Sequence, residues 1–287
     1  MQSEDQAPVR AWIEYFRDLG IHEFYRVGEP AAVAVSEPRA SSAIRIASEE
    51  IGPQFADAMP STQPISETTF VPPLNLISFN DLAPLPTVVV PSAQREAALR
   101  AIQQEIGDCT RCPLAYAGRR KIVFGDGSPT ARLMFVGEGP GADEDAQGLP
   151  FVGKAGQLLN NMIGAMGLER AEVYIANIVK CRPPGNRVPE PVEANTCSQF
   201  LLRQIDVVQP EVVVALGATA ATYLLGVKQS LSSLRGQWHL CRGAKLAVTY
   251  HPAFLLRDPR QKAEAWKDLQ MVMRELGFTP PAPKKNA

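Results

Sequence analysis

The stretch RLMFVGEGPG at residues 132–141 decides the fold class, because an apolar run passes directly into a glycine-rich turn. The apolar part predicts a buried strand, and the glycines predict a tight turn at its carboxyl end. The same alternation continues along the chain, with strands predicted at 173–179, 211–216 and 245–249 and helices at 94–106, 155–166, 190–208 and 260–276. Strands alternating with helices predict an α/β fold, a three-layer α/β/α sandwich around a four-stranded, mainly parallel sheet. Ligands of such folds bind at the carboxyl ends of the strands.

The globular pattern occupies only part of the chain, and we place its domain at residues 94–278. Residues 1–27 are predicted to form a short amphipathic segment, and residues 28–93 a flexible linker rich in proline, alanine and serine. Residues 279–287 are predicted to be a disordered tail. Segments 8–28 and 74–79 are candidate contacts for a protein partner. A helix docked on the main domain explains the first equally well, and a chance apolar patch is favoured for the second.

The charge of the chain is divided between these parts. The net charge is −1, but residues 1–93 hold five Arg, no Lys and twelve acidic residues, which gives 5 − 12 = −7. The remaining 24 basic and 18 acidic residues give the rest of the chain a charge of +6. A basic domain is compatible with phosphate binding. No stretch is apolar enough to span a membrane, and the first residues lack the order of a secretory signal. We expect a monomer in the cytoplasm, associated with the nucleoid.

The odd number of five cysteines favours metal ligation or catalysis over disulfides in a cytosolic chain. Cys109 and Cys112 form a CxxC motif, and Cys181 and Cys197 enclose a proline-rich loop. Two pairs of thiolates suit a [4Fe–4S] cluster or a structural zinc ion, and the long second spacing favours the cluster. Four buried free cysteines are the alternative without a metal. Cys241 lacks a partner in the pattern and is interpreted as a small core residue.

Three segments end or follow predicted strands and should therefore lie together. They are the turn that begins at Gly137, the strand end at Asn177, and the segment that begins at His251. Closely spaced glycines allow a backbone to approach a ligand, although such a turn alone is weak evidence. Of the three histidines only His251 follows a strand end, which makes it a candidate catalytic residue.

Five blocks of the sequence, in this order, resemble the iron–sulfur uracil-DNA glycosylases (family 4). The resemblance covers about residues 94–277. The blocks are CxxC at 109–112, GEGPG at 137–141, LPFVGKAG at 149–156, NIVKCRPP at 177–184 and HPAFLLR at 251–257. Together they strengthen the choice of a [4Fe–4S] cluster bound by Cys109, Cys112, Cys181 and Cys197.

The resemblance implies roles for further residues in binding uracil-containing DNA, single- or double-stranded. Phe151 would stack on the extruded base, Asn177 would bind its Watson–Crick edge, and the backbone at Gly137, Glu138 and Gly139 would hold it. His251 would donate a hydrogen bond to uracil O2. The turn Leu255, Leu256 and Arg257 would enter the duplex, with Arg182, Arg187 and Arg257 near phosphates. Phe151 and the two leucines as core residues, and Asn177 as a turn cap, are the alternatives without a function.

The expected reaction is hydrolysis of the N-glycosidic bond of a flipped-out uracil, leaving an abasic site without strand cleavage. In the better-known uracil glycosylases an Asp orients water and a Tyr excludes thymine, whereas Gly139 and Gly141 stand at these positions here. Glu138 and Glu144 are therefore both candidates to orient the water. A relative that crosslinks to or processes DNA through a different nucleophile is an alternative, and some such relatives use a histidine in the loop after the second strand. This alternative is disfavoured, because the loop at residues 181–188 contains no histidine. An iron–sulfur DNA-binding or redox module would not need Phe151, Asn177 and His251 together.

Overall fold

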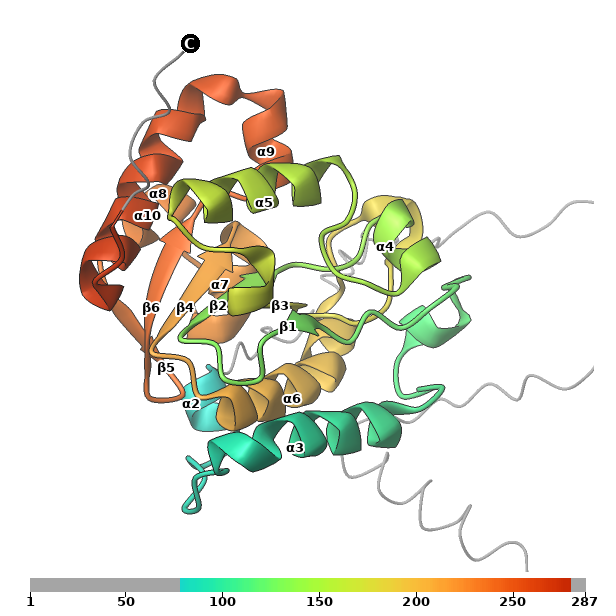
Figure 1. Ribbon diagram of the computed structural model, residues 1–287. Coiled ribbons are helices and arrows are strands. Elements are labelled where there is room, and N and C mark those ends of the chain that lie inside the picture. Colours follow the sequence, from blue (N-terminus) through green and yellow to red (C-terminus); the bar gives the residue numbers. More distant parts are fainter. Residues whose placement is uncertain (1–77, 280–287) are drawn as a thin grey trace, which may run out of the picture. The chain divides into compact units, whose positions relative to one another are not determined.

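A six-stranded mixed sheet forms the centre of residues 78–279, the part of the chain that this computed structural model describes (Figure 1). The strand order is β1-β3-β2-β4-β6-β5. The strands are β1 Asp126–Gly127, β2 Leu133–Gly137, β3 Tyr174–Asn177, β4 Val212–Leu216, β5 His239–Cys241 and β6 Ala244–Thr249. Strands β3, β2, β4 and β6 are parallel and are the four predicted strands, whereas β1 and β5 pair antiparallel at the two edges. The prediction of a four-stranded sheet missed these edges, because two or three residues carry no readable periodicity.

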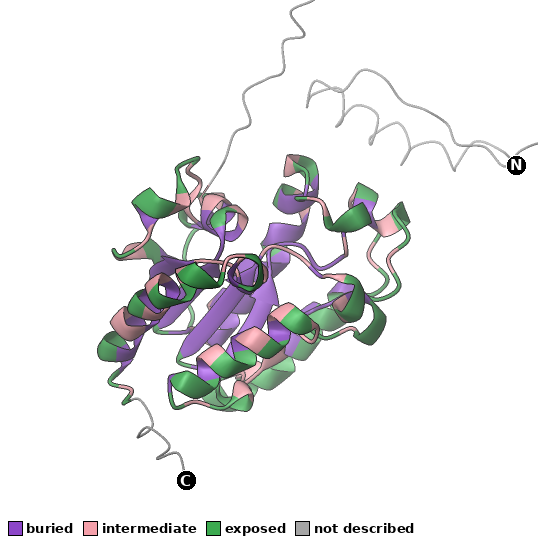
Figure 2. Ribbon diagram, turned by 90° about the horizontal axis from the view of Figure 1, so that it is seen from above, coloured by how far each residue is buried: buried purple, intermediate pink, exposed green. Residues whose placement is uncertain are grey.

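Helices cover both faces of the sheet, as Figures 1 and 2 show. Along β2, Met134 and Val136 face one core with α3, α6 and α7, while Leu133 and Phe135 face a second core with α5 and α10. The strands are buried on both faces because helices cover both. The longer helices are α3 Ser92–Ile106, α5 Lys154–Ala165, α6 Pro191–Val208, α7 Ala218–Leu225 and α10 Lys262–Leu276. The shorter ones are α2 Phe79–Leu82, α4 Ala142–Gln147, α8 Leu231–Leu234 and α9 Pro252–Arg257, with 3₁₀ turns η1 Pro113–Tyr116, η2 Arg170–Glu172, η3 Pro184–Asn186 and η4 Pro259–Gln261.

The folded body begins before Gln94, where the sequence pattern placed its boundary. Phe79 in α2 is 1% exposed within the core. The buried guanidinium of Arg242 donates to the carbonyl of Pro84 at 2.9 Å and pairs with Asp206 at 2.7 Å. Residues 78–93 therefore belong to the folded body and not to the predicted linker. Contacts across some 160 residues hold them there, and no local pattern in the sequence announces such contacts.

The predictions for residues 1–27, for the linker up to residue 77 and for the tail from residue 280 lie outside the described residues. The same holds for the candidate partner segment 8–28 and for most of 74–79. Phe79, the last residue of that second segment, packs in the core. Cys241 is fully buried, as expected of a core residue. None of the helices between residues 78 and 279 has the length and apolar character to cross a membrane.

Candidate active site

The ends of β2 and β3 bring Gly137 and Asn177 opposite each other in the parallel register. Asn177 is 1% exposed, and its Oδ1 is the one buried side-chain nitrogen or oxygen within the described residues that has no hydrogen-bond partner. A Cβ on Gly137 would lie 2.6 Å from Phe151 Cζ and would overlap Asn177 Oδ1. Gly137 therefore gives both side chains the space they occupy. An unpaired buried acceptor is costly to a folded protein and indicates a missing donor.

The ring of Phe151 lies beside this strand end and next to His251, with ring centroids 5.6 Å apart. Phe151 has φ +50°, in the left-handed region that side chains with a Cβ seldom adopt. Its carbonyl lies so close to Gly156 that any Cβ there would overlap it. The backbone of Phe151 is thus held in one defined and unusual conformation, which sets the direction of the ring.

His251 caps the amino end of α9, where its Nδ1 accepts a hydrogen bond from the backbone N–H of Ala253 at 3.1 Å. Burial lowers the pKa of His251 to about 4, and Arg257 adds to this effect while Glu144 opposes it. The imidazole is therefore neutral at pH 7. Because Nδ1 is the acceptor, the proton of the neutral ring is on Nε2, which is free to donate.

The two candidate carboxylates have different surroundings. Glu144 Oε1 accepts from the backbone N–H of Val152 at 2.9 Å and of Gly153 at 3.0 Å, and Oε2 accepts from Gly141 at 3.0 Å. These bonds occupy the carboxylate and connect α4 to the loop that carries Phe151. Burial raises the pKa of Glu138, although a hydrogen bond from Thr219 opposes the rise. Glu138 is the less occupied of the two.

The residues expected to contact DNA divide into exposed side chains, which are free to reach DNA, and side chains that are buried or already paired. Leu256 is 44% exposed and Arg257 is exposed, but Leu255 is 1% exposed and packs inside the protein. The LLR segment is part of α9, so adjacent residues point in different directions and a wedge of two leucines does not form. Arg187 donates to both oxygens of the buried Glu193 at 2.8 and 2.7 Å, so its charge is already paired.

Arg182 differs from Arg187, because no acidic side chain of residues 78–279 pairs with it. Its Nε donates to the side chain of Asn186 at 2.8 Å, which is a neutral partner. Lys180, two residues earlier, is buried, and its ammonium donates to Asn177 O at 3.0 Å and to Gln204 Oε1 at 2.6 Å. Burial lowers the pKa of Lys180 to about 7. These contacts make Lys180 a support for the end of β3.

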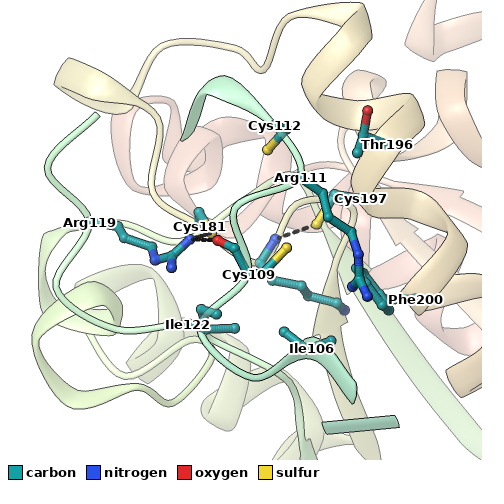
Figure 3. Close-up of a pocket in the computed structure, with 11 residues that line it drawn as sticks. Ile106, Cys109, Arg111, Cys112, Arg119, Ile122, Cys181, Thr196, Cys197 and Phe200 are labelled. Carbon is teal, nitrogen blue, oxygen red and sulfur yellow. Dashed lines mark hydrogen bonds between the residues drawn. The ribbon is translucent and has the colours of Figure 1, made fainter. Parts of the chain in front are cut away.

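The four predicted cysteine ligands line one cavity, shown in Figure 3, between α3, the segment after β3 and α6. Cys181 and Cys197 are 5% and 7% exposed, whereas Cys109 and Cys112 are partly exposed. Arg119 donates to Cys181 Sγ at 3.4 Å, and the backbone N–H of Lys180 donates to Cys197 Sγ at 3.2 Å. N–H···S bonds of this kind stabilise thiolates bound to iron–sulfur clusters.

The donor set fits a cluster of several metal atoms. Four soft thiolates with cationic neighbours are suited to Fe–S chemistry. Within residues 78–279 no three His, Cys, Asp or Glu side chains gather closely enough to hold a single metal ion. The four cysteines line one cavity and would be the residues to hold a cluster there.

Comparison with known proteins identifies the family of the chain. The model of the uracil DNA glycosylase superfamily matches residues 124–270, which include the β2 and β3 strand ends and His251. A type-4 uracil-DNA glycosylase of Thermotoga maritima is 45% identical over 168 residues, 57% of this chain and 86% of that protein. The chain belongs to the type-4 uracil-DNA glycosylases. Proteins of the same name from Sulfurisphaera tokodaii and Pyrobaculum aerophilum are 41% and 40% identical, over 64% and 60% of this glycosylase and 86% and 92% of their own lengths.

Sequence motifs did not single out the residues that support this glycosylase's site. Arg119 donates to Cys109 O, Arg170 donates to Pro150 O, and Glu193 accepts from the nearby Arg187. An arginine in a loop is ordinarily a surface residue. Only its contacts in the fold identify it as a support.

Proposed function

We propose that this glycosylase removes uracil from DNA by hydrolysing the N-glycosidic bond, leaving an abasic site without cutting the strand. The observation that carries the proposal is Asn177 Oδ1, buried and unpartnered beside Phe151 and a neutral His251. A base inside a duplex must first be flipped out, at a cost of a few kcal/mol. These three residues supply the contacts that a flipped uracil needs.

Recognition of uracil would rest on Asn177 and Phe151. The N3–H of uracil is a donor that satisfies Oδ1, and O4 accepts from the carboxamide N–H₂. Cytosine has an acceptor at N3 and a donor at N4, so it would leave the same amide mispaired. The Phe151 ring would stack on the base, and the backbone of Gly137, Glu138 and Gly139 would lie along its edge. The buried amide thus selects uracil over cytosine in two ways, by its hydrogen bonds to uracil and by the free energy lost when cytosine leaves it unpaired.

Bond cleavage leaves negative charge on the departing uracil and positive charge on the sugar. His251 Nε2–H would donate to uracil O2, a hydrogen bond that strengthens as the charge develops. A neutral imidazole suits this role, because the base can leave as an anion without taking the proton. Burial keeps His251 neutral throughout the physiological range.

We propose Glu138 as the carboxylate that orients the attacking water. Glu144 bonds three backbone amides, so its role would be to hold the Phe151 loop. Removing Glu144 would therefore affect stability together with activity, whereas removing Glu138 would affect mainly kcat.

We also propose that Cys109, Cys112, Cys181 and Cys197 hold a [4Fe–4S] cluster. When bound, the cluster would cross-link the segment before β1 to the 181–197 loop. Arg119 and the Lys180 backbone would donate to its thiolates. Arg187 and Glu193 would order the loop from within, so phosphate contact would pass to Arg182 and Arg257, with Leu256 as the wedge.

For the whole chain, we propose a glycosylase domain that begins at or before Ser78 and ends near residue 278. It would act as a monomer on the DNA of the cytoplasm. It would contact a protein partner through residues 8–28 or 74–79, with Phe79 of the second segment packed in the core.

The test is incubation with single- and double-stranded oligonucleotides that contain one uracil, thymine or cytosine, followed by alkali. The proposal expects cleavage after alkali only for uracil, with His251→Ala reduced by about 100-fold or more. Intact uracil strands with the wild-type protein would contradict the proposed activity. Equal cleavage by His251→Ala would contradict the role of His251.

A further inference from the structure

Arg170 lies outside every motif of the sequence, yet its guanidinium reaches the loop that carries Phe151. We propose that Arg170 is a positioning residue for uracil stacking, which fixes the Phe151 ring through the backbone carbonyls of the loop. The inference rests on the proposed function, since it assigns Phe151 the role of stacking on the base.

The carbonyl contacts are direct. Arg170 Nη2 donates to Pro150 O at 2.6 Å, and Nη1 donates to Phe151 O at 3.1 Å. These two carbonyls lie on either side of the Phe151 φ and ψ angles. The guanidinium therefore restrains the backbone angles that set the direction of the ring. The planar fork of arginine can satisfy two acceptors at once, which the point charge of lysine does less well.

The loop needs such a restraint because its backbone conformation is unfavourable by itself. Phe151 is one of four described residues other than glycine with positive φ. Its carbonyl lies against Gly156, at a distance where any Cβ would overlap it. Glu144 binds the amides of Val152 and Gly153 on the following side. Arg170 and Glu144 therefore hold opposite polar groups of one short loop.

Arg170 is itself anchored to the sheet. It pairs with Asp126 of β1 at 3.2 Å, and its Nη1 also donates to Asn160 Oδ1 of α5 at 3.1 Å. Its own turn, η2, leads directly into β3, which ends at Asn177. One segment, residues 170–177, thus fixes both the residue proposed to stack on the base and the residue proposed to read its edge.

The experiment compares Arg170→Met and Arg170→Lys with Asp126→Asn and Asn160→Ala in the full chain. The readouts are kcat/KM on a uracil oligonucleotide, inhibition by free uracil, and affinity for an abasic-site oligonucleotide. Thermal denaturation checks that each variant is folded. Free uracil probes stacking directly, while the abasic DNA lacks the base and reports on the remaining contacts.

We expect Arg170→Met to lower kcat/KM by about 10- to 100-fold and to weaken uracil inhibition by a similar factor, with abasic-DNA affinity within about 2-fold of wild type. Arg170→Lys keeps the charge and is expected to recover little of the loss. Asp126→Asn and Asn160→Ala keep the carbonyl contacts but weaken the anchor of the guanidinium, so each should lose less activity than Arg170→Met.

Unchanged uracil inhibition in folded Arg170→Met, or full activity in Arg170→Lys, would overturn the inference. If Arg170→Met does not fold, Arg170→Lys decides alone. A wild-type protein that releases no uracil would overturn the proposed function and the inference with it, whereas an active wild type with an unaffected Arg170 variant overturns only the inference.

Discussion

Gly137→Ala adds one methyl group at the point where the proposed uracil contacts meet. The new Cβ would lie 2.6 and 2.7 Å from two ring atoms of Phe151 and would also overlap Asn177 Oδ1. Carbon atoms pack best at about 3.5 Å or more, so the ring must move by about 0.9 Å. Gly137 has no positive φ, so the backbone itself tolerates alanine.

This displacement sets the expected size of the effect. A misplacement of about 1 Å in a catalytic site can lower the rate by about 100-fold, equivalent to about 2.7 kcal/mol of transition-state stabilisation. Overpacking a buried site costs about 1–3 kcal/mol of folding free energy. For a body of about 200 residues each kcal/mol lowers Tm by about 2–4 °C, which leaves the variant folded at assay temperature.

The assay measures kcat/KM on a uracil oligonucleotide together with Tm. Gly164→Ala in α5 is the matched control, because a Cβ at Gly164 meets nothing within 4 Å. Alanine is the better helix former by up to about 1 kcal/mol, so this variant should keep full activity and match or exceed the wild-type Tm. A folded Gly137→Ala protein with wild-type kcat/KM would refute the placement of the base beside Gly137.

Three further predictions concern buried ionisable groups. Burial lowers the pKa of His251 from 6.5 to about 4, so the unfolded chain binds this proton more readily and the free energy of unfolding falls as pH drops from about 6.5 towards 4. In a series of denaturation curves over this pH range, His251→Gln should reduce the dependence of that free energy on pH, and an unchanged dependence would contradict the prediction. Lys180 is bound inside the protein, so borohydride with uracil-DNA should trap no covalent adduct; an adduct would contradict hydrolysis by water alone. Arg242→Met leaves Asp206 without its partner and should lower the free energy of unfolding, measured in urea, by about 3–5 kcal/mol. Arg132→Met, at an exposed ion pair, should lower it by less than about 1 kcal/mol, and equal losses in the two variants would contradict the anchoring role of Arg242.

The fold could be predicted as far as periodicity reaches. The strand at residues 133–137 is fully apolar because it is covered on both faces, and that run is visible in the sequence. The edge strands β1 and β5 are too short to show a periodic pattern, and α2 is held by Arg242, far away in the sequence, which donates to Phe79 O. Long-range hydrogen bonds decide such elements, and a local pattern does not contain them.

The site could be predicted in its members but less well in their roles. Gly137, Asn177 and His251 lie together because parallel strands end at one edge of the sheet, and the loop between α4 and α5 adds Phe151 beside them. Leu255 was predicted to enter DNA, but the helical turn of α9 buries it and exposes its neighbour. Arg187 was assigned to phosphate, but Glu193 neutralises it. Sequence position identifies which residues lie near a site, whereas pairing and burial decide what they are free to do.

The central claim is that Asn177 reads the edge of a flipped uracil through its unpaired Oδ1. The most direct measurement compares uracil release from double-stranded DNA by wild type and Asn177→Ala, with Tm recorded for both. A lost pair of hydrogen bonds to a buried group predicts a fall in kcat/KM of about 100-fold or more. The variant should remain folded, because truncation also removes an acceptor that the free protein leaves unsatisfied. Uracil release at the wild-type rate by folded Asn177→Ala would contradict the claim.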